Sequence, residues 1–276
     1  MKIYTSKYDR CFKCIHLNPS NQDLLLLQIY QVTGIKLNMI NYSNVERNSD
    51  NIFVKRKTLD CLIDSELYSF NIEVNAKDEE YVKPRNTSYN CDVYSNDTKI
   101  RGVYDEKKDI IQINYSYGLK YNEAVRVYTI SDESNNQYVK NFKIYEINMD
   151  YIMNFWYNRN KQQSNFEYIY KYRYFIMLNL KYDELNELIK MANDERIVKY
   201  MKELMRVNSN PKFRRFISEE EDQQFIKNSL IAQGEKLGER RGKIDIAKKS
   251  LKANLSLDTI SQITGLTFDE ISKIKV

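Results

Sequence analysis

The sequence contains little proline and glycine and no long apolar run. Its 276 residues include 3 Pro and 7 Gly, which is too few for long flexible linkers. No stretch approaches the roughly 18 consecutive apolar residues that a membrane-spanning helix requires, and the first ten residues, MKIYTSKYDR, hold no apolar segment of the secretory kind. We therefore expect a cytoplasmic chain with no membrane partner.

The sequence lacks the residues that several kinds of active site and metal site require. The chain has 1 His, His16, and 4 Cys, and it has no Gly-rich phosphate loop or Walker pattern. A single histidine gives no basis for a serine-type triad. Cys11 and Cys14 have the CxxC spacing, but no second CxxC follows, whereas a structural zinc site takes four ligands. Reduced, partly buried cysteines are therefore favoured over a zinc site.

What is present is a globular composition. Hydrophobic residues make up 42% and charged residues 29% of the chain, and the formal net charge is +5. This length and composition suit one large domain with an extension, or two small domains. The mildly basic balance permits nucleic-acid binding without requiring it.

The first 150 residues carry mixed α and β patterns. A helix is expected to start with Ser20 as its cap and Asp23 in its first turn, and to stop at Gly34. The clearest strand covers residues 68–77, where apolar and polar residues alternate as on a half-buried strand. Other strands are expected within residues 35–43, 52–64, 109–115, 124–130 and 142–149.

After residue 150 the patterns become helical. Helices are expected over residues 151–159, 166–180, 182–206 and 218–233. This change predicts a mixed α/β core at 1–150, a helical region at 151–233 and a tail at 234–276. In the tail, Gly234, Gly238 and Gly242 recur every four residues, so that in a helix they form one stripe, although each costs about 1 kcal/mol of helix stability.

The tail ends in a predicted pair of short helices, the second capped by Thr267. This pair could enter a major groove, but a packing or dimerisation hairpin is favoured because it presents few base-reading side chains. The basic residues of 236–252 could contact phosphates or form a solvated helix face. The Tyr-rich run at 166–175 could stack bases, but amphipathic tyrosines of a helical core are favoured.

Two carboxylates raise the question of a metal site. Glu73 shares its predicted strand face with Asn75 and Lys77, and the turn at residues 64–66 can fold Asp60 back beside it. Two carboxylates on adjacent strands suit Mg²⁺, which prefers oxygen ligands, and the Val74 carbonyl could be a third ligand. The alternative is an ordinary solvated sheet face.

Four segments of the chain resemble one family. Residues 59–60 and 71–75 resemble the core of the PD-(D/E)XK nucleases, in particular the PD-(D/E)XK nuclease family transposases, which are related to recombination-promoting nucleases. The opening at residues 8–13 with the following Leu-rich helix, the segment with Arg85 and Tyr89, and the ending at 234–274 are similar to the same group. Residues 90–230 match only in outline.

The resemblance implies a fold and an activity. It implies a restriction-endonuclease-like sheet flanked by helices, with a C-terminal helical extension, and Mg²⁺-dependent (or Mn²⁺-dependent) hydrolysis of DNA. Asp60 and Glu73 match the metal-binding acids, and Asn75 takes the place of the usual Lys or Gln. Because Asn carries no positive charge, Lys77 or Arg85 would have to supply it, and Arg85 and Tyr89 would contact substrate. The alternative is an inactive nuclease fold that binds DNA or protein, with a homodimer through the C-terminal helices as a further expectation.

Overall fold

The computed structural model describes residues 2–39, 41–42, 46–47, 57–58, 61–101, 108–161 and 164–274. Its contacts group the chain into two compact units, Met1–Asn210 and Pro211–Val276. The fold class is mixed α/β, as expected. The functional boundaries expected at residues 150 and 233 stay predictions, because a division by contacts does not test them.

A six-stranded mixed sheet forms the centre of the first unit. Its order is β1-β4-β5-β6-β8-β7. β5, β6 and β8 run parallel to one another, whereas β4 is antiparallel to both β1 and β5, and β7 is antiparallel to β8. The strand bounds are Asn41–Tyr42 (β1), Cys61–Asp64 (β4), Tyr68–Asn75 (β5), Asp109–Ser116 (β6), Val125–Ser131 (β7) and Gln137–Asn148 (β8), and β2 (Glu46–Arg47) and β3 (Lys57–Thr58) form a separate pair.

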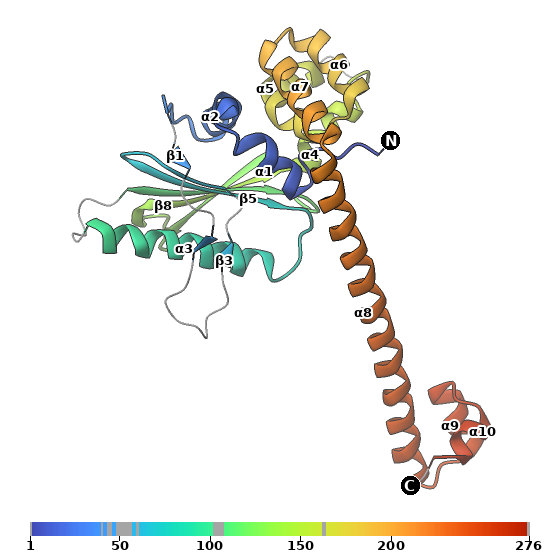
Figure 1. Cartoon of the computed structure of the whole chain (residues 1–276). Helices are drawn as coiled ribbons and strands as arrows, with labels where there is room; N and C mark the ends of the chain where they lie inside the picture. The colour runs from blue at the N-terminus through green and yellow to red at the C-terminus, as the bar shows by residue number, and fades with distance from the viewer. Residues whose placement is uncertain are drawn as a thin grey trace. The chain divides into compact units, whose positions relative to one another are not determined.

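Helices cover the two faces of this sheet differently (Figure 1). The long helix α3, Val82–Arg101, lies along one face and makes the crossover from β5 to the parallel strand β6. The opposite face carries α1 (Asp9–His16) and α2 (Gln22–Thr33). Tyr115 of β6 connects this second face to the helices, since its ring contacts Phe12 and its hydroxyl donates to Gln28 at 2.8 Å.

The helices that follow β8 include α7, Glu195–Ser209, which packs against the N-terminal segment of the first unit. Asn208 bonds the backbone of Tyr4 in both directions, at 2.8 and 2.9 Å, and the hydroxyls of Ser6 and Tyr200 lie 2.8 Å apart. These contacts join residues that are about 200 positions apart in the chain. The helices are α4 (Met149–Tyr157), α5 (Ser164–Ile176), α6 (Tyr182–Ala192) and α7 (Glu195–Ser209), with short 3₁₀ turns at Pro19–Asn21 and Met177–Asn179.

Most expected elements are present, with different ends. The strands expected at 109–115, 124–130 and 142–149 correspond to β6, β7 and β8, and Gly34 ends α2 in the left-handed conformation at φ 72°. The expected cap Ser20 is wrong, because Ser20 lies inside a 3₁₀ turn that Asn18 caps. The single helix expected at 182–206 is two helices, because Asn193 is left-handed at φ 46° and Asp194 caps α7.

The strand at 68–77 was expected to be half-buried and is buried on both faces. It ends at Asn75, so that Lys77 lies beyond it. Val74 of this strand pairs with Tyr115, whose ring contacts Phe12 of α1, so its apolar face is the one on the side of the N-terminal helices. Asn75, on the other face, accepts a hydrogen bond from Arg85 of α3, a helix that was not expected from the sequence. Asn71, Glu73 and Asn75 are consequently no more than 4% exposed.

The second unit consists of three helices: α8 (Pro211–Lys252), α9 (Leu257–Thr264) and α10 (Phe268–Ser272). The last turns of α8 pack with α9 and α10 around Ala247, Ile260, Leu266 and Ile271. Thr267 and Glu270 form a reciprocal capping box at the start of α10. The expected short helix pair and its Thr267 cap are thus confirmed. No helix among the described residues is long and apolar enough to cross a membrane.

Candidate functional site

Polar residues line up across the carboxyl ends of the three parallel strands. Glu73 on β5 is paired with Asn114 on β6, and Asn114 is paired with Glu146 on β8. Two residues further on, Asn75 pairs with Ser116. Since side chains two residues apart on a strand share a face, all five lie on the sheet face that α3 covers. Ligand sites of α/β sheets are found at this end of the strands.

This polar face is buried. We use the name for nine residues, each at most 4% exposed, seven on the sheet and two on α3: Asn71, Glu73, Asn75, Gln112, Asn114, Ser116, Glu146, Asn86 and Asn90. Burying so many amide, hydroxyl and carboxylate groups costs free energy unless they are hydrogen-bonded. A polar layer of this kind therefore indicates either an internal network or a place where a ligand or water is bound.

A chain of hydrogen bonds runs across the polar face. Arg85, on the first turn of α3, donates from Nη2 to Oδ1 of Asn75 at 2.7 Å. The Asn75 amide donates to Ser116 Oγ at 3.3 Å, and Ser116 Oγ donates to Glu146 Oε1 at 3.5 Å. The chain thereby connects a guanidinium at one end to a buried carboxylate at the other, with Asn75 in the middle.

The guanidinium of Arg85 is held by two amide oxygens. Besides Asn75, it donates from Nε and Nη2 to Oδ1 of Asn86 at 3.2 and 3.1 Å. Its Nη1 has no hydrogen bond to any residue that the structure describes. The ring of Tyr89, one turn further along α3, lies 5.8 Å from the Arg85 Cζ atom. The cation is therefore fixed in place with one nitrogen still able to donate.

Glu146 accepts two tyrosine hydroxyls at the other end of the chain. Tyr121 and Tyr128 donate to its Oε2 at 3.3 and 3.2 Å. Burial, and then the Glu146 charge, raise the pKa of both phenols, so that both remain donors at neutral pH. A cavity of about 220 Å³ opens beside Glu146, between α3 and the sheet, and it is lined by Lys83, Asn86, Thr87, Asn114, Tyr128, Ile144 and Glu146.

The deeper part of the polar face is not fully bonded. Among the described residues, both side-chain polar atoms of Asn71 and of Asn90, and Oε1 of Gln112, have no hydrogen-bond partner. Gln112 does donate to Asn114 Oδ1 at 2.8 Å. Each buried atom of this kind costs about 1–3 kcal/mol. Unless water or a ligand bonds them, these amides lower the stability of the fold.

The predicted site residues are only partly brought together. Glu73, Asn75 and Arg85 lie around one region of the polar face, and Val74 is half-buried beside them. Lys77 is exposed, two residues after the end of β5. Asp60 lies outside the described residues. Its neighbour Cys61, however, is paired with Ile72, the residue before Glu73.

Sequence reasoning missed Glu146. The signal was present, because Glu73-Val-Asn75 and Glu146-Ile-Asn148 are two copies of one short pattern, each at the end of a parallel strand. Only the sheet order, with β6 between β5 and β8, brings the two patterns into one row. Because α3 was not expected from the sequence, the hydrogen bond from Arg85 to Asn75 was not expected either.

The residues beside Glu73 in the sheet register carry oxygen atoms, and no cluster of histidines or cysteines accompanies them in the described part of the chain. No group of three His, Cys, Asp or Glu residues suited to a metal occurs in the described part of the chain. The donors around Glu73 on the polar face are amide and hydroxyl groups of Asn75, Asn114 and Ser116. Such a donor set fits a hard cation like Mg²⁺, which retains several waters, better than zinc.

His16 and the buried cysteines Cys11 and Cys61 belong to the structural core rather than to this site. His16 is fully buried, its Nδ1 bonds the Phe12 carbonyl at 3.1 Å, and its Nε2 lies 3.3 Å from the Gln28 amide nitrogen. Burial lowers the pKa of His16 to about 4. None of the four cysteines forms a disulfide, two being buried and two exposed, and burial raises the pKa of Cys11 to about 12.

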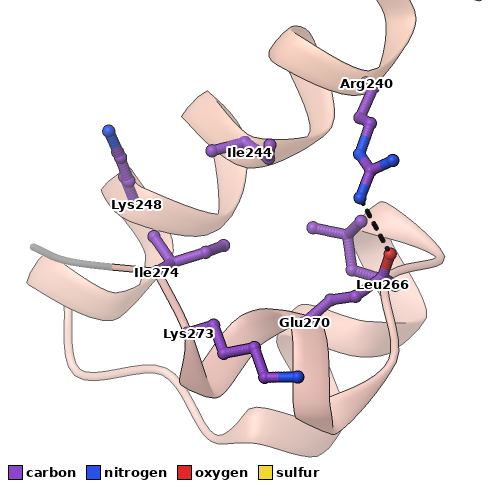
Figure 2. Close-up of a pocket in the computed structure, with 7 residues that line it drawn as sticks. All are labelled: Arg240, Ile244, Lys248, Leu266, Glu270, Lys273 and Ile274. Atoms are coloured by element: carbon purple, nitrogen blue, oxygen red, sulfur yellow. Dashed lines mark ion pairs between the residues drawn. The ribbon is translucent and has the colours of Figure 1, made fainter.

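A second hollow lies in the C-terminal unit (Figure 2). It has a volume of about 420 Å³ and is lined by Arg240, Ile244, Lys248, Leu266, Glu270, Lys273 and Ile274. Figure 2 shows Arg240 of α8 directed across it towards Glu270 of α10, and these two form an ion pair at 3.6 Å. Its floor belongs to the core that holds α9 and α10 against α8. The two short helices thus form a hairpin that packs on the last turns of α8.

Comparison with known proteins adds no family, because no protein-family model, no curated protein and no solved structure matches this chain.

Proposed function

We propose that the chain is a metal-dependent endonuclease of the PD-(D/E)XK kind that hydrolyses DNA phosphodiester bonds. The observation that carries this proposal is the contact between Arg85 and Asn75, at the end of the strand that holds Glu73. In the group that the sequence resembles, this position holds lysine or, often, glutamine, and Asn75 lacks the positive charge of the lysine. The Arg85 guanidinium supplies a positive charge at that place.

The acidic half of the site is assigned to Glu73 and Asp60. The pairing of Cys61 with Ile72 supports this assignment, since Asp60 precedes the one and Glu73 follows the other. Together with the Val74 carbonyl, these groups would hold Mg²⁺ or Mn²⁺. When bound, the metal supplies an activated water and offsets negative charge on a phosphoryl oxygen.

The other residues act on the phosphate. Arg85 donates to a non-bridging oxygen through Nη1 and stabilises the charge that develops there. Asn75 and Asn86 hold the guanidinium in position, so Asn75 is a positioning residue. Lys77, exposed at the end of the strand, attracts the DNA backbone. Tyr89 lies beside Arg85 and offers a ring for contact with a sugar or base.

The testing experiment is supercoiled-plasmid nicking with Mg²⁺ or Mn²⁺. The full chain would be compared with Glu73→Gln, Lys77→Ala and Arg85→Ala, with circular dichroism to establish folding and fluorescence anisotropy to measure DNA affinity. We expect metal-dependent nicking that Glu73→Gln abolishes without loss of folding. If the wild-type protein is folded and binds DNA but never nicks it, the proposal of a nuclease is refuted.

The second candidate is a nuclease fold that binds DNA or protein without cleaving. The observation that favours it is the involvement of both Asn75 polar atoms in internal bonds, to Arg85 and to Ser116. In that case DNA affinity would be unaffected by Mg²⁺ and by Glu73→Gln. Strand transfer, which the word transposase implies for the resembled group, forms no part of either proposal.

A further inference from the structure

Helix α8 has a long section in which every residue is exposed. The helix comprises 42 residues, Pro211–Lys252, and at 1.5 Å per residue it is about 63 Å long. All residues from 218 to 242 are exposed. Helices of this length with no packed face are typically stabilised by another helix.

A stripe of apolar residues follows this exposed section. Ile226, Leu230 and Leu237 are 57%, 62% and 52% exposed. With Gln233 they have the spacing 4, 3, 4, which is the spacing of the a and d positions of a coiled coil. The next positions of this repeat at its two ends are the polar residues Gln223 and Arg240, and Arg240 also forms the ion pair with Glu270. Phe225 and Ile231 are also exposed but lie off the stripe. The stripe therefore has the pattern of a helix-pairing seam.

Charges are distributed unevenly along the same section. Residues 219–222 are Glu, Glu, Glu and Asp, whereas residues 240, 241 and 243 are Arg, Arg and Lys. The acidic run and the basic run lie at opposite ends of the apolar stripe. One helix therefore carries both halves of a complementary surface, which allows two identical copies to pair by a two-fold axis.

We propose that α8 pairs with α8 of a second copy of this chain in an antiparallel coiled coil, with the two-fold axis between Leu230 and Gln233. In this register Leu237 of one copy packs against Ile226 of the other, and Leu230 packs against Gln233. The pairing buries the apolar stripe along its whole exposed length. It depends on neither cleavage nor DNA binding.

The flanking charges fit this register. In antiparallel coiled coils, an e position of one helix lies opposite an e position of the other, and a g position lies opposite a g position. Glu220 of one copy then faces Arg241 of the other, and Asp222 faces Lys243. Each contact occurs twice by symmetry. A parallel pair would instead place Lys236 beside Arg241 and Lys243 beside Lys248, which is repulsive.

The first measurement is the molar mass of the full chain by light scattering at micromolar concentration. We expect twice the 33.1 kDa of one chain. The charge-reversed variant Asp222→Lys should weaken the dimer roughly fivefold, as should Lys243→Asp. The double variant with both changes should restore wild-type affinity. A wild-type monomer, or a double variant weaker than either single one, would overturn the proposal.

Disulfide trapping then decides the direction of the helices. In a background with the exposed Cys14 and Cys91 changed to serine, Gln223→Cys combined with Arg240→Cys should give an oxidised dimer, because these positions face each other. Each single cysteine should give none, because identical positions lie far apart along an antiparallel pair. Dimers from each single variant would indicate parallel helices and contradict the proposal. Disulfides formed only with another helical protein, and none between two copies of this chain, would contradict it as well.

Discussion

The guanidinium of Arg85 donates a 2.7 Å hydrogen bond to the side-chain oxygen of Asn75. Ten residues separate the two in sequence, and they belong to different elements, α3 and β5. The contact places a fixed positive charge beside the strand that carries Glu73. Under the proposed nuclease function, this guanidinium would supply the positive charge that Asn75 lacks.

Loss of the Arg85 charge should reduce catalysis more than folding. We expect Arg85→Ala to lower the nicking rate at saturating DNA about 10²-fold, since removing one donor to a developing oxyanion has effects of this size. Arg85→Lys should recover only part of the rate, because an ammonium cannot bond two amide oxygens in a planar fork. Arg215→Ala, at a solvent-exposed arginine of α8, is the matched control. An unchanged rate for Arg85→Ala would remove Arg85 from the mechanism.

Glu146 should stabilise the fold through the hydroxyls that it accepts. Glu146→Leu leaves the hydroxyls of Tyr121 and Tyr128 without an acceptor, and we expect the free energy of unfolding to fall by about 3 kcal/mol. Glu146→Gln retains an oxygen acceptor and should lower it by only about 1 kcal/mol. Urea unfolding measures both values. The exposed Glu123, which is paired with Arg126, provides the control: Glu123→Gln should leave the free energy of unfolding nearly unchanged, because exposed ion pairs contribute little.

The unbonded amide of Asn90 should be replaceable with a gain in stability. Neither of its side-chain polar atoms has a partner among the described residues. Asn90→Leu should therefore raise the free energy of unfolding by about 1 kcal/mol. Asn86→Leu, on the same helix, should lower it, because Asn86 accepts two bonds from Arg85. Destabilisation by Asn90→Leu equal to that of Asn86→Leu would mean that Asn90 is fully bonded in solution.

Stability should decrease in mild acid because of His16. Burial lowers the pKa of His16 from 6.5 to about 4. Its Nε2 faces the amide nitrogen of Gln28, which is a donor, so a proton on Nε2 would place two donors against each other. Between pH 6.5 and pH 4 the unfolded chain binds a proton that the folded chain does not, so the free energy of unfolding falls as the pH falls, by up to roughly 3 kcal/mol. Above pH 6.5 this contribution is constant.

The corresponding variant isolates that contribution. His16→Gln cannot titrate, so its free energy of unfolding should vary less between pH 6.5 and pH 4 than that of the wild type. Urea denaturation at half-unit pH intervals gives both curves. Parallel curves would show that another group governs acid sensitivity in this range.

The sequence by itself determined the fold class and most of the elements. The alternation along residues 109–115, 124–130 and 142–149, the left-handed stop at Gly34 and the capping pair Thr267 and Glu270 are local signals, and local signals depend only on neighbouring residues. The same local reading identified Glu73 and Asn75 as site candidates. It erred at Ser20 and at residues 182–206, where a neighbouring Asn in each case supplied the decisive cap or turn.

The tertiary structure alone decided which residues share the site. Burial of the polar side of β5 beneath α3 could not be inferred from alternation, because an alternating strand reads the same whether its polar face meets solvent or a polar helix face. The partnership of Arg85 with Asn75, and the alignment of Glu146 with Glu73 through Asn114, depend on the crossover of α3 and on the strand order. Both depend on packing between segments that are far apart in the sequence, and the pattern of a single segment holds no information about such packing.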